Sequence, residues 1–173
     1  MVKAAPVPAW ERPLWTCPEC GQRFVTRNMW HGCAVVPWEA HFEGRPRARQ
    51  LWAALRAMVE ADGPVTIVST KTGLGFMTRV RFGGCQVRKD YLRCVVWLKR
   101  RYESPRIARI EQWGPTDFGM FFEVRRAEDL DDDVRLLFHE ARAVGDQQHL
   151  RAKAAATRAG RGEPPVEAAS REA

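Results

Sequence analysis

Apolar side chains recur with helical spacing in two segments of this chain. Between residues 46 and 62 they come three or four positions apart, which is the period of an amphipathic α-helix that starts near Pro46 and ends at Gly63-Pro64. The same period before Gly145 predicts a second helix, whose first turn holds aspartates where the helix dipole favours negative charge. The apolar positions are Leu51, Trp52, Leu55, Met58 and Val59 in the first helix, and Leu130, Val134, Leu137, Phe138 and Ala141 in the second.

Other segments follow the two-residue period of β-strands. Residues 76–82 alternate between apolar and polar side chains, which indicates a half-exposed strand. Gly83-Gly84 is then typical of a two-residue hairpin turn. We expect the return strand over 85–98, with a bulge or a second turn at 88–90. Further strands are expected over 65–68, 107–111 and 118–124.

The order of these elements predicts an α+β fold. Because no long crossover helix separates the strands, the simplest packing is an antiparallel β-meander of four or five strands with helices on one face. An extended arm and a small zinc module are expected over 1–35, the α+β domain over 36–145, and a tail over 146–173. Hardly any large apolar residue follows Leu150, so the tail is expected to be disordered or a frayed helix.

Cysteines and histidines near the N-terminus have the spacing of a metal site. Cys17 and Cys20 are separated by two residues, so both thiolates can bind one metal ion. His31 and Cys33 can supply two more ligands, which would complete a tetrahedral Cys3His site for a structural zinc ion. Two alternatives stay open at this point: a reduced thiol cluster without metal, and a site in which His41 replaces His31.

Composition adds an expectation about location. The chain has 173 residues, enough for one domain with appendages, and contains neither an apolar membrane span nor a signal-peptide segment. It has 5 cysteines, an odd number, and three of them belong to the metal motif. We therefore expect a cytoplasmic protein with no membrane partner.

Positive charge is concentrated in the middle of the chain. Residues 45–109 carry fifteen basic and four acidic side chains, whereas the whole chain has a net charge of +7. Strand alternation would bring many of these cations to one sheet face, interleaved with Tyr91 and Trp97, and such faces hold single-stranded nucleic acid by ion pairing and stacking. An ordinary solvated sheet face is the alternative. The candidate nucleic-acid-binding residues are Arg79, Arg81, Arg88, Lys89, Arg93, Lys99, Arg100 and Arg101.

Several short segments together resemble a bacterial family known as domain of unknown function 5655. The resemblance spans about residues 15–145 and supports these domain boundaries, but it implies no reaction. Its segments are Trp15 to Gly21, Trp30 to Cys33, Phe76 to Phe82, Arg88 to Leu92, Gly114-Pro115 and Glu128 to Asp132.

Three classes of function are compatible with the sequence. The first is a zinc-containing module that binds single-stranded nucleic acid or another polyanion, without catalysis. The second is a module that binds a protein partner and whose zinc is purely structural. The third is an unrecognised enzyme, which is less favoured because the chain lacks a dinucleotide-binding glycine motif, a P-loop, a nucleophile elbow and a His-Glu-x-x-His motif.

Overall fold

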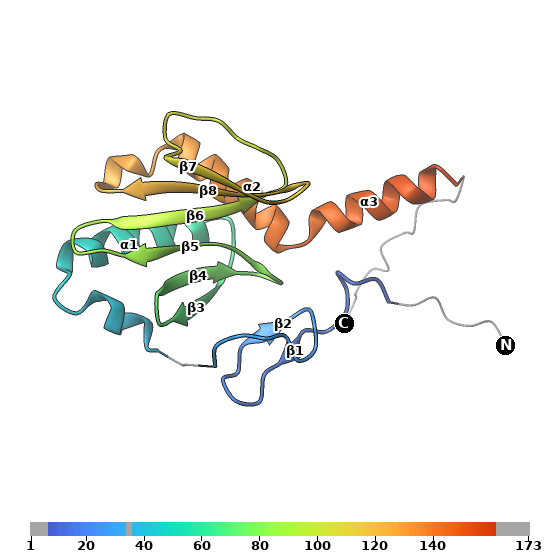
Figure 1. Ribbon diagram of the computed structural model, residues 1–173, viewed down its shortest axis with the longest axis horizontal. Helices are drawn as coiled ribbons and strands as arrows, with labels where there is room; N and C mark the ends of the chain where they lie inside the picture. The colour runs from blue at the N-terminus through green and yellow to red at the C-terminus, as the bar shows by residue number, and fades with distance from the viewer. Residues whose placement is uncertain (1–6, 34–35, 162–173) are drawn as a thin grey trace.

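A six-stranded antiparallel sheet forms the centre of the protein, with helices on one of its faces (Figure 1). The computed structural model describes residues 7–33 and 36–161. This arrangement confirms the α+β class, with six strands in the sheet instead of the expected four or five. The strands are β3 (Thr66–Thr70), β4 (Gly73–Met77), β5 (Arg81–Val87), β6 (Leu92–Leu98), β7 (Arg109–Gly114) and β8 (Asp117–Val124), in the spatial order β3-β4-β5-β6-β8-β7.

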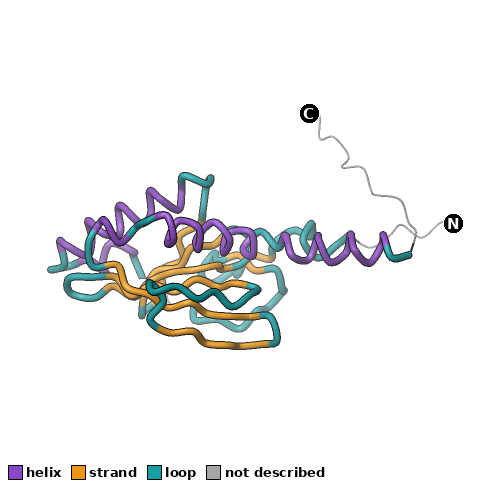
Figure 2. The backbone as a smooth tube through the Cα atoms, turned by 90° about the horizontal axis from the view of Figure 1, so that it is seen from above, coloured by secondary structure: helices purple, strands orange, loops and turns teal. Residues whose placement is uncertain are grey.

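The helices α1 (Pro46–Glu60) and α2 (Asp132–Gly145) lie on the same face of the sheet (Figure 2). Their apolar stripes bury large side chains against the strands, as the helical period predicts. Trp52 of α1 stacks on Phe76 of β4 with a centroid distance of 5.1 Å, and Phe138 of α2 meets Phe76 edge-on at 5.7 Å. A short 3-10 helix, η1 (Trp38–Phe42), precedes α1, and another, η2 (Ala127–Asp129), precedes α2. No helix in the described part of the chain is long and apolar enough to span a bilayer.

The turn between β4 and β5 differs from the sequence prediction. It falls at residues 78–80, and Gly83 and Gly84 lie inside β5 instead of forming a hairpin turn. Gly84 is the cross-strand partner of Gly75, and a Cβ atom on Gly84 would lie 2.3 Å from the carbonyl oxygen of Leu74. Glycine is therefore needed here because β4 and β5 approach closely, and not because the chain turns.

The meander is also interrupted once. After β6 the chain forms β7 at the edge of the sheet, one strand position away from β6. β8 then fills the position between β6 and β7. β7 covers Arg109–Gly114, whereas the sequence analysis placed this strand at 107–111.

Beyond α2 the chain continues as a third helix, α3 (Gln148–Ala159), which projects from the sheet (Figure 1). None of its residues is buried. Gln147 separates α2 from α3 with a left-handed backbone conformation at φ 60°. The expected tail over 146–173 therefore includes a regular helix, and its last part, 162–173, lies outside the described residues, as do residues 1–6 of the N-terminal arm. The boundaries at 35 and 145 stay predictions.

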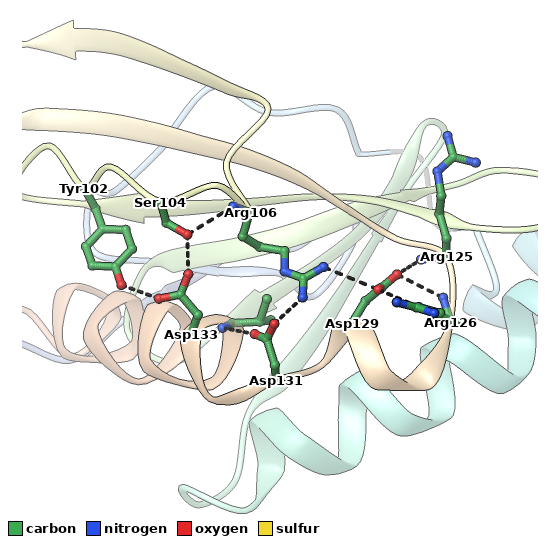
Figure 3. A network of polar contacts seen from close by, with 9 residues as sticks. Tyr102, Ser104, Arg106, Arg125, Arg126, Asp129, Asp131 and Asp133 are labelled. Atoms are coloured by element: carbon green, nitrogen blue, oxygen red, sulfur yellow. Dashed lines mark hydrogen bonds and ion pairs between the residues drawn. The ribbon is translucent and has the colours of Figure 1, made fainter.

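A polar network fixes the connection between β6 and β7 to the start of α2 (Figure 3). Asp133 accepts hydrogen bonds from the hydroxyl groups of Tyr102 and Ser104. Arg106 pairs with Asp131 and, at 3.3 Å, with Asp129. Asp131 is also the N-cap of α2 and accepts from the backbone N–H of Val134 at 3.0 Å. Asp131 thus caps the helix, and Asp131 and Asp133 together anchor a long loop.

Replacing Asp129 with asparagine is expected to destabilise the protein by about 2 kcal/mol, because a buried acceptor of several hydrogen bonds becomes partly a donor. Asp129 Oδ2 accepts from the backbone N–H groups of Arg125 and Arg126 at 2.8 and 3.1 Å, and the side chain is only 10% exposed. Urea denaturation at pH 7 measures the loss. Asp132→Asn is the matched control, because that carboxylate is fully exposed in the same region.

The effect of Asp129→Asn should depend on pH. Burial alone would raise the pKa of Asp129, but hydrogen bonds from the backbone N–H groups of Arg125 and Arg126, with the neighbouring arginines, outweigh it and lower the pKa. A lowered folded-state pKa adds stability above the unfolded pKa of about 4, and this stability is lost as the pH falls through the folded value. The difference between wild type and variant should therefore shrink on acidification, and a constant difference down to low pH would argue against this role.

Candidate metal centre and open sheet face

The candidate metal ligands lie on a small hairpin module beside the sheet. β1 (Trp15–Thr16) pairs with β2 (Arg23–Phe24), and the turn between them carries Cys17 and Cys20. The backbone N–H of Cys17 donates to the carbonyl of Gln22 at 2.8 Å, and Gly21 closes the turn at φ 71°. Glycine adopts this left-handed conformation without strain, which explains its place directly after Cys20.

Cys17, Cys20, His31 and Cys33 form one cluster that could hold a metal ion, with all four ligand atoms within 4.8 Å of one another. Cys17 Sγ lies 3.9 Å from Cys33 Sγ, and His31 Nε2 lies 3.2 Å from Cys20 Sγ and 3.3 Å from Cys33 Sγ. Tetrahedral zinc would require about 3.8 Å between two thiolates and about 3.5 Å between a thiolate and an imidazole nitrogen. The cluster therefore has the size of a tetrahedral Cys3His site.

Contacts around His31 orient its ring for ligation through Nε2. Its Nδ1 lies 2.7 Å from the carbonyl oxygen of Met29, so Nδ1 carries the proton and donates it, and the lone pair is left on Nε2. Phe24 packs against the ring with a centroid distance of 4.4 Å. His41, the alternative ligand, lies in η1 and its Nε2 is 3.2 Å from Ser69 Oγ. His31, rather than His41, therefore belongs to the cluster that could hold a metal ion.

Three thiols so close together cannot all ionise without a cation. Burial and the neighbouring thiols of Cys17 and Cys20 raise the pKa of Cys33 to about 11. At Cys17, burial alone would raise the pKa, but hydrogen bonds from the backbone N–H groups of Cys20 and Glu19 outweigh it and lower the pKa to about 7. One thiolate is therefore favoured by the turn, and a bound cation would stabilise the other two.

The sheet face opposite α1 and α2, which we call the open face, has a different character. Along β6, Arg93 and Trp97 point to this face, while Leu92, Cys94, Val96 and Leu98 are buried under the helices. Its other main residues are Gly75, Arg81, Gly84, Gln86, Arg109 and Phe121. A face of this kind, with cations around glycine and aromatic positions, can contact an anionic ligand directly.

The hairpin module that carries the candidate metal ligands, residues 15–33, is called the metal module below. It borders the open face. Arg23 of β2 donates to Thr66 Oγ1 of β3 at 3.4 Å, so the hairpin lies next to the edge strand (Figure 1). A hollow of about 400 Å³ separates the module from the sheet, lined by Met29 and Trp30 on one side and by Arg81 and Trp97 on the other. The side chain of Trp30 is 93% exposed. An exposed tryptophan at the rim of a hollow is available for stacking or for partner contacts.

The eight candidate nucleic-acid-binding residues do not form one continuous patch. Arg81 and Arg93 lie on the open face, Arg88 donates to Gln86 Oε1 at 2.8 Å, and Lys89 is exposed in the turn after β5. The other four have partners that strand alternation does not predict, although Arg79 and Lys99 each line a hollow beside Arg81 and Trp97. Arg79 donates to the carbonyl oxygens of Ala9 and Arg12, Lys99 pairs with Asp117, Arg100 pairs with Glu140 and Arg101 pairs with Glu103.

Sequence reasoning missed Arg109, which joins Arg81 and Arg93 on the open face. Its guanidinium lies 4.1 Å above the ring of Phe121 and pairs with Glu111 at 2.6 Å. The expected strand over 107–111 contains Arg109, but only its pairing with Phe121 of β8 places it on the open face.

Arg81 differs from the other cations of the open face. Arg93 lies 3.7 Å from Glu123, which is itself bound by Arg125 at 2.6 Å. Among the described residues Arg81 has neither a carboxylate partner nor a hydrogen-bond acceptor, and burial lowers its pKa. A half-buried guanidinium without an anion is costly, so this position favours binding of an external anion.

No family model, curated protein or solved structure matches this chain. The resemblance to the bacterial family of unknown function therefore stays a prediction.

Proposed function

We propose that the protein binds single-stranded nucleic acid on its open sheet face, next to a structural zinc module. The observation that carries this proposal is the position of Arg81 and Trp97, which both line three adjoining hollows. These hollows have volumes of about 300, 400 and 390 Å³ and extend from the metal module across β6 to β7 and α3. A guanidinium and an indole at the centre of such a surface are suited to a phosphate and a base.

Zinc is proposed for the Cys3His cluster because thiolates and imidazole together are its preferred ligands. Four protein ligands leave no open coordination position for a substrate or an activated water. The metal is therefore proposed to be structural, and its role is to hold Met29 and Trp30 at the edge of the open face.

A protein partner is the second candidate. It is favoured by the exposure of Trp30 and Met29, which form an apolar rim on the metal module. Apolar rims of this kind occur at protein interfaces as well as at stacking sites. The two candidates differ in salt dependence, because ion pairing with phosphates weakens steeply with salt and apolar contacts do not.

Fluorescence titration of labelled single-stranded DNA and RNA tests the proposal. If three or four cations contact phosphates, the logarithm of the affinity should fall against the logarithm of the salt concentration with a slope of about −2 to −3. The double variant Arg93→Gln, Arg109→Gln should bind about tenfold or more weakly at low salt, because two phosphate contacts are lost.

The matched control removes the same charge from the helical side. Arg49 of α1 and Arg135 of α2 are exposed and lie away from the open face, so Arg49→Gln, Arg135→Gln should change affinity little. Equal losses in the two double variants, or no binding of either polymer at low salt, would remove the nucleic-acid proposal and favour the protein partner.

A further inference from the structure

One hollow of the open face has the chemistry of a small anion site. It has a volume of about 300 Å³ and lies over β4, β5 and β6, with Arg109 and Phe121 at its far wall. Its polar side chains include Arg81, Arg93 and Gln86, and none of the described residues that line it is acidic. A pocket of this size is at the lower end of the range for small-molecule sites, which is about 300–1,000 Å³.

The available hydrogen-bonding groups of this pocket are mainly donors. Guanidinium groups donate and cannot accept. Gln86 uses Oε1 to accept from Arg88 at 2.8 Å, so its amide nitrogen is left as a donor. An anion with several acceptor oxygens would satisfy these groups, whereas a cation or another donor would leave them unpaired.

Gly75 gives Arg81 its place in the pocket. A Cβ atom on Gly75 would lie 2.9 Å from Arg81 Nε, which means that the arginine side chain crosses directly over this glycine. The side chain is thereby held flat against the sheet without a carboxylate partner among the described residues. This arrangement pre-organises a cation for an incoming anion.

We propose that this pocket binds a single phosphate-bearing nucleotide, with the phosphate against Arg81 and Arg93 and the base against Trp97. The proposal rests on the proposed function, since it assigns one nucleotide of the bound strand to a defined pocket. The same chemistry would be offered by a free nucleoside 5′-monophosphate and by the phosphorylated 5′ end of a strand. Trp97 supplies the aromatic surface because it lines this pocket as well as the hollow next to the metal module.

Isothermal titration calorimetry of the full chain with nucleoside 5′-monophosphates, the matching nucleosides and inorganic phosphate tests the pocket. We expect the monophosphates to bind, and the nucleosides and inorganic phosphate to bind about tenfold or more weakly, because each lacks one half of the contacts. Arg81→Gln should weaken monophosphate binding by a similar factor. Gly75→Ala should also weaken it, because the new methyl group displaces Arg81, while Arg49→Gln on α1 should not.

Oligonucleotides with and without a 5′-phosphate separate the two sources of the ligand. A preference for the 5′-phosphorylated strand, competed by the mononucleotide, would support a strand end in the pocket, and mononucleotide binding without that preference would support a free nucleotide. Absence of monophosphate binding at millimolar concentration, or unchanged binding in Arg81→Gln, would overturn the pocket. Salt-sensitive oligonucleotide binding that survives Arg81→Gln would support the proposed function and reject the pocket. Mononucleotide binding without any oligonucleotide binding would support the pocket and reject the proposed function.

Discussion

Replacing Cys17 with serine is expected to unfold the metal module while the six-stranded sheet stays folded. The module has too little of its own structure to persist, because β1 and β2 pair over only two residues each. Cys17 is the buried candidate ligand of the module, and the ring of Phe24 packs on the candidate ligand His31. Metal binding supplies folding free energy of the order of 10 kcal/mol in modules of this kind, so loss of one ligand removes most of what holds the segment.

Metal analysis and amide hydrogen exchange check this expectation together. Wild-type protein should contain about one zinc ion per chain, and Cys17→Ser should lose both the metal and the protection of residues 15–33. Glu19→Ser is the control, because Glu19 is an exposed residue of the same turn and its side chain is not a ligand. Wild-type protein that is free of metal and still protected over 15–33 would refute the site.

The Cys17→Ser variant also tests whether the metal module contributes to nucleic-acid binding. Met29 and Trp30 face Arg81 and Trp97 across one hollow, and the module is joined to β3 by the bond from Arg23 to Thr66. If the open face binds nucleic acid, unfolding of the module removes one wall of that surface. Oligonucleotide affinity should then fall in Cys17→Ser, although none of the arginines on the open face has been changed.

The candidate metal centre could be predicted from the sequence because its signal is local. Cys17 and Cys20 need only the short turn between them to reach one ion, and His31 and Cys33 follow as a closely spaced pair. Whether His31 or His41 completes the site could not be decided, because that choice depends on the contacts of each ring. Met29 orients His31, whereas Ser69 lies far along the chain and engages His41.

The helices and the faces that they bury could also be predicted from the sequence, since the apolar periods of α1 and α2 directly predict burial of Trp52 and Phe138. The residues of the open face could not be predicted in this way. Its predicted composition assumed an uninterrupted strand over 76–82, but a register shift between Phe76 and Met77 and a turn at 78–80 remove Arg79 from the strand. Arg109 escaped because the sequence does not show that β7 pairs with β8, and this pairing places Arg109 beside Phe121.

Gly83-Gly84 shows why the hairpin was misplaced. Adjacent glycines are most often used for a turn, because they adopt left-handed conformations freely. Here the second glycine serves a contact that is invisible in the sequence, the approach of β5 to the backbone of Leu74. Such an approach depends on which strands become neighbours, so local pattern alone could not distinguish it from a turn.

Replacing Gly84 with alanine is therefore expected to destabilise the protein by about 3 kcal/mol, at the upper end of what overpacking costs. The new Cβ would lie 2.3 Å from the carbonyl oxygen of Leu74 and 3.0 Å from the Cα of Gly75. Both atoms belong to the backbone of β4, which is paired on both sides and cannot move without breaking its hydrogen bonds. Chemical denaturation measures the loss.

Gly75→Ala is the matched control, because Gly75 is the cross-strand partner of Gly84 on the same face. Its Cβ would meet the side chain of Arg81 at 2.9 Å, and a flexible side chain can move away where a backbone cannot. We expect Gly75→Ala to cost less than about 1 kcal/mol in stability. Equal costs for the two variants would contradict the close approach of β4 and β5, whereas a stable Gly75→Ala protein with weakened nucleotide binding would separate the function of the open face from its folding.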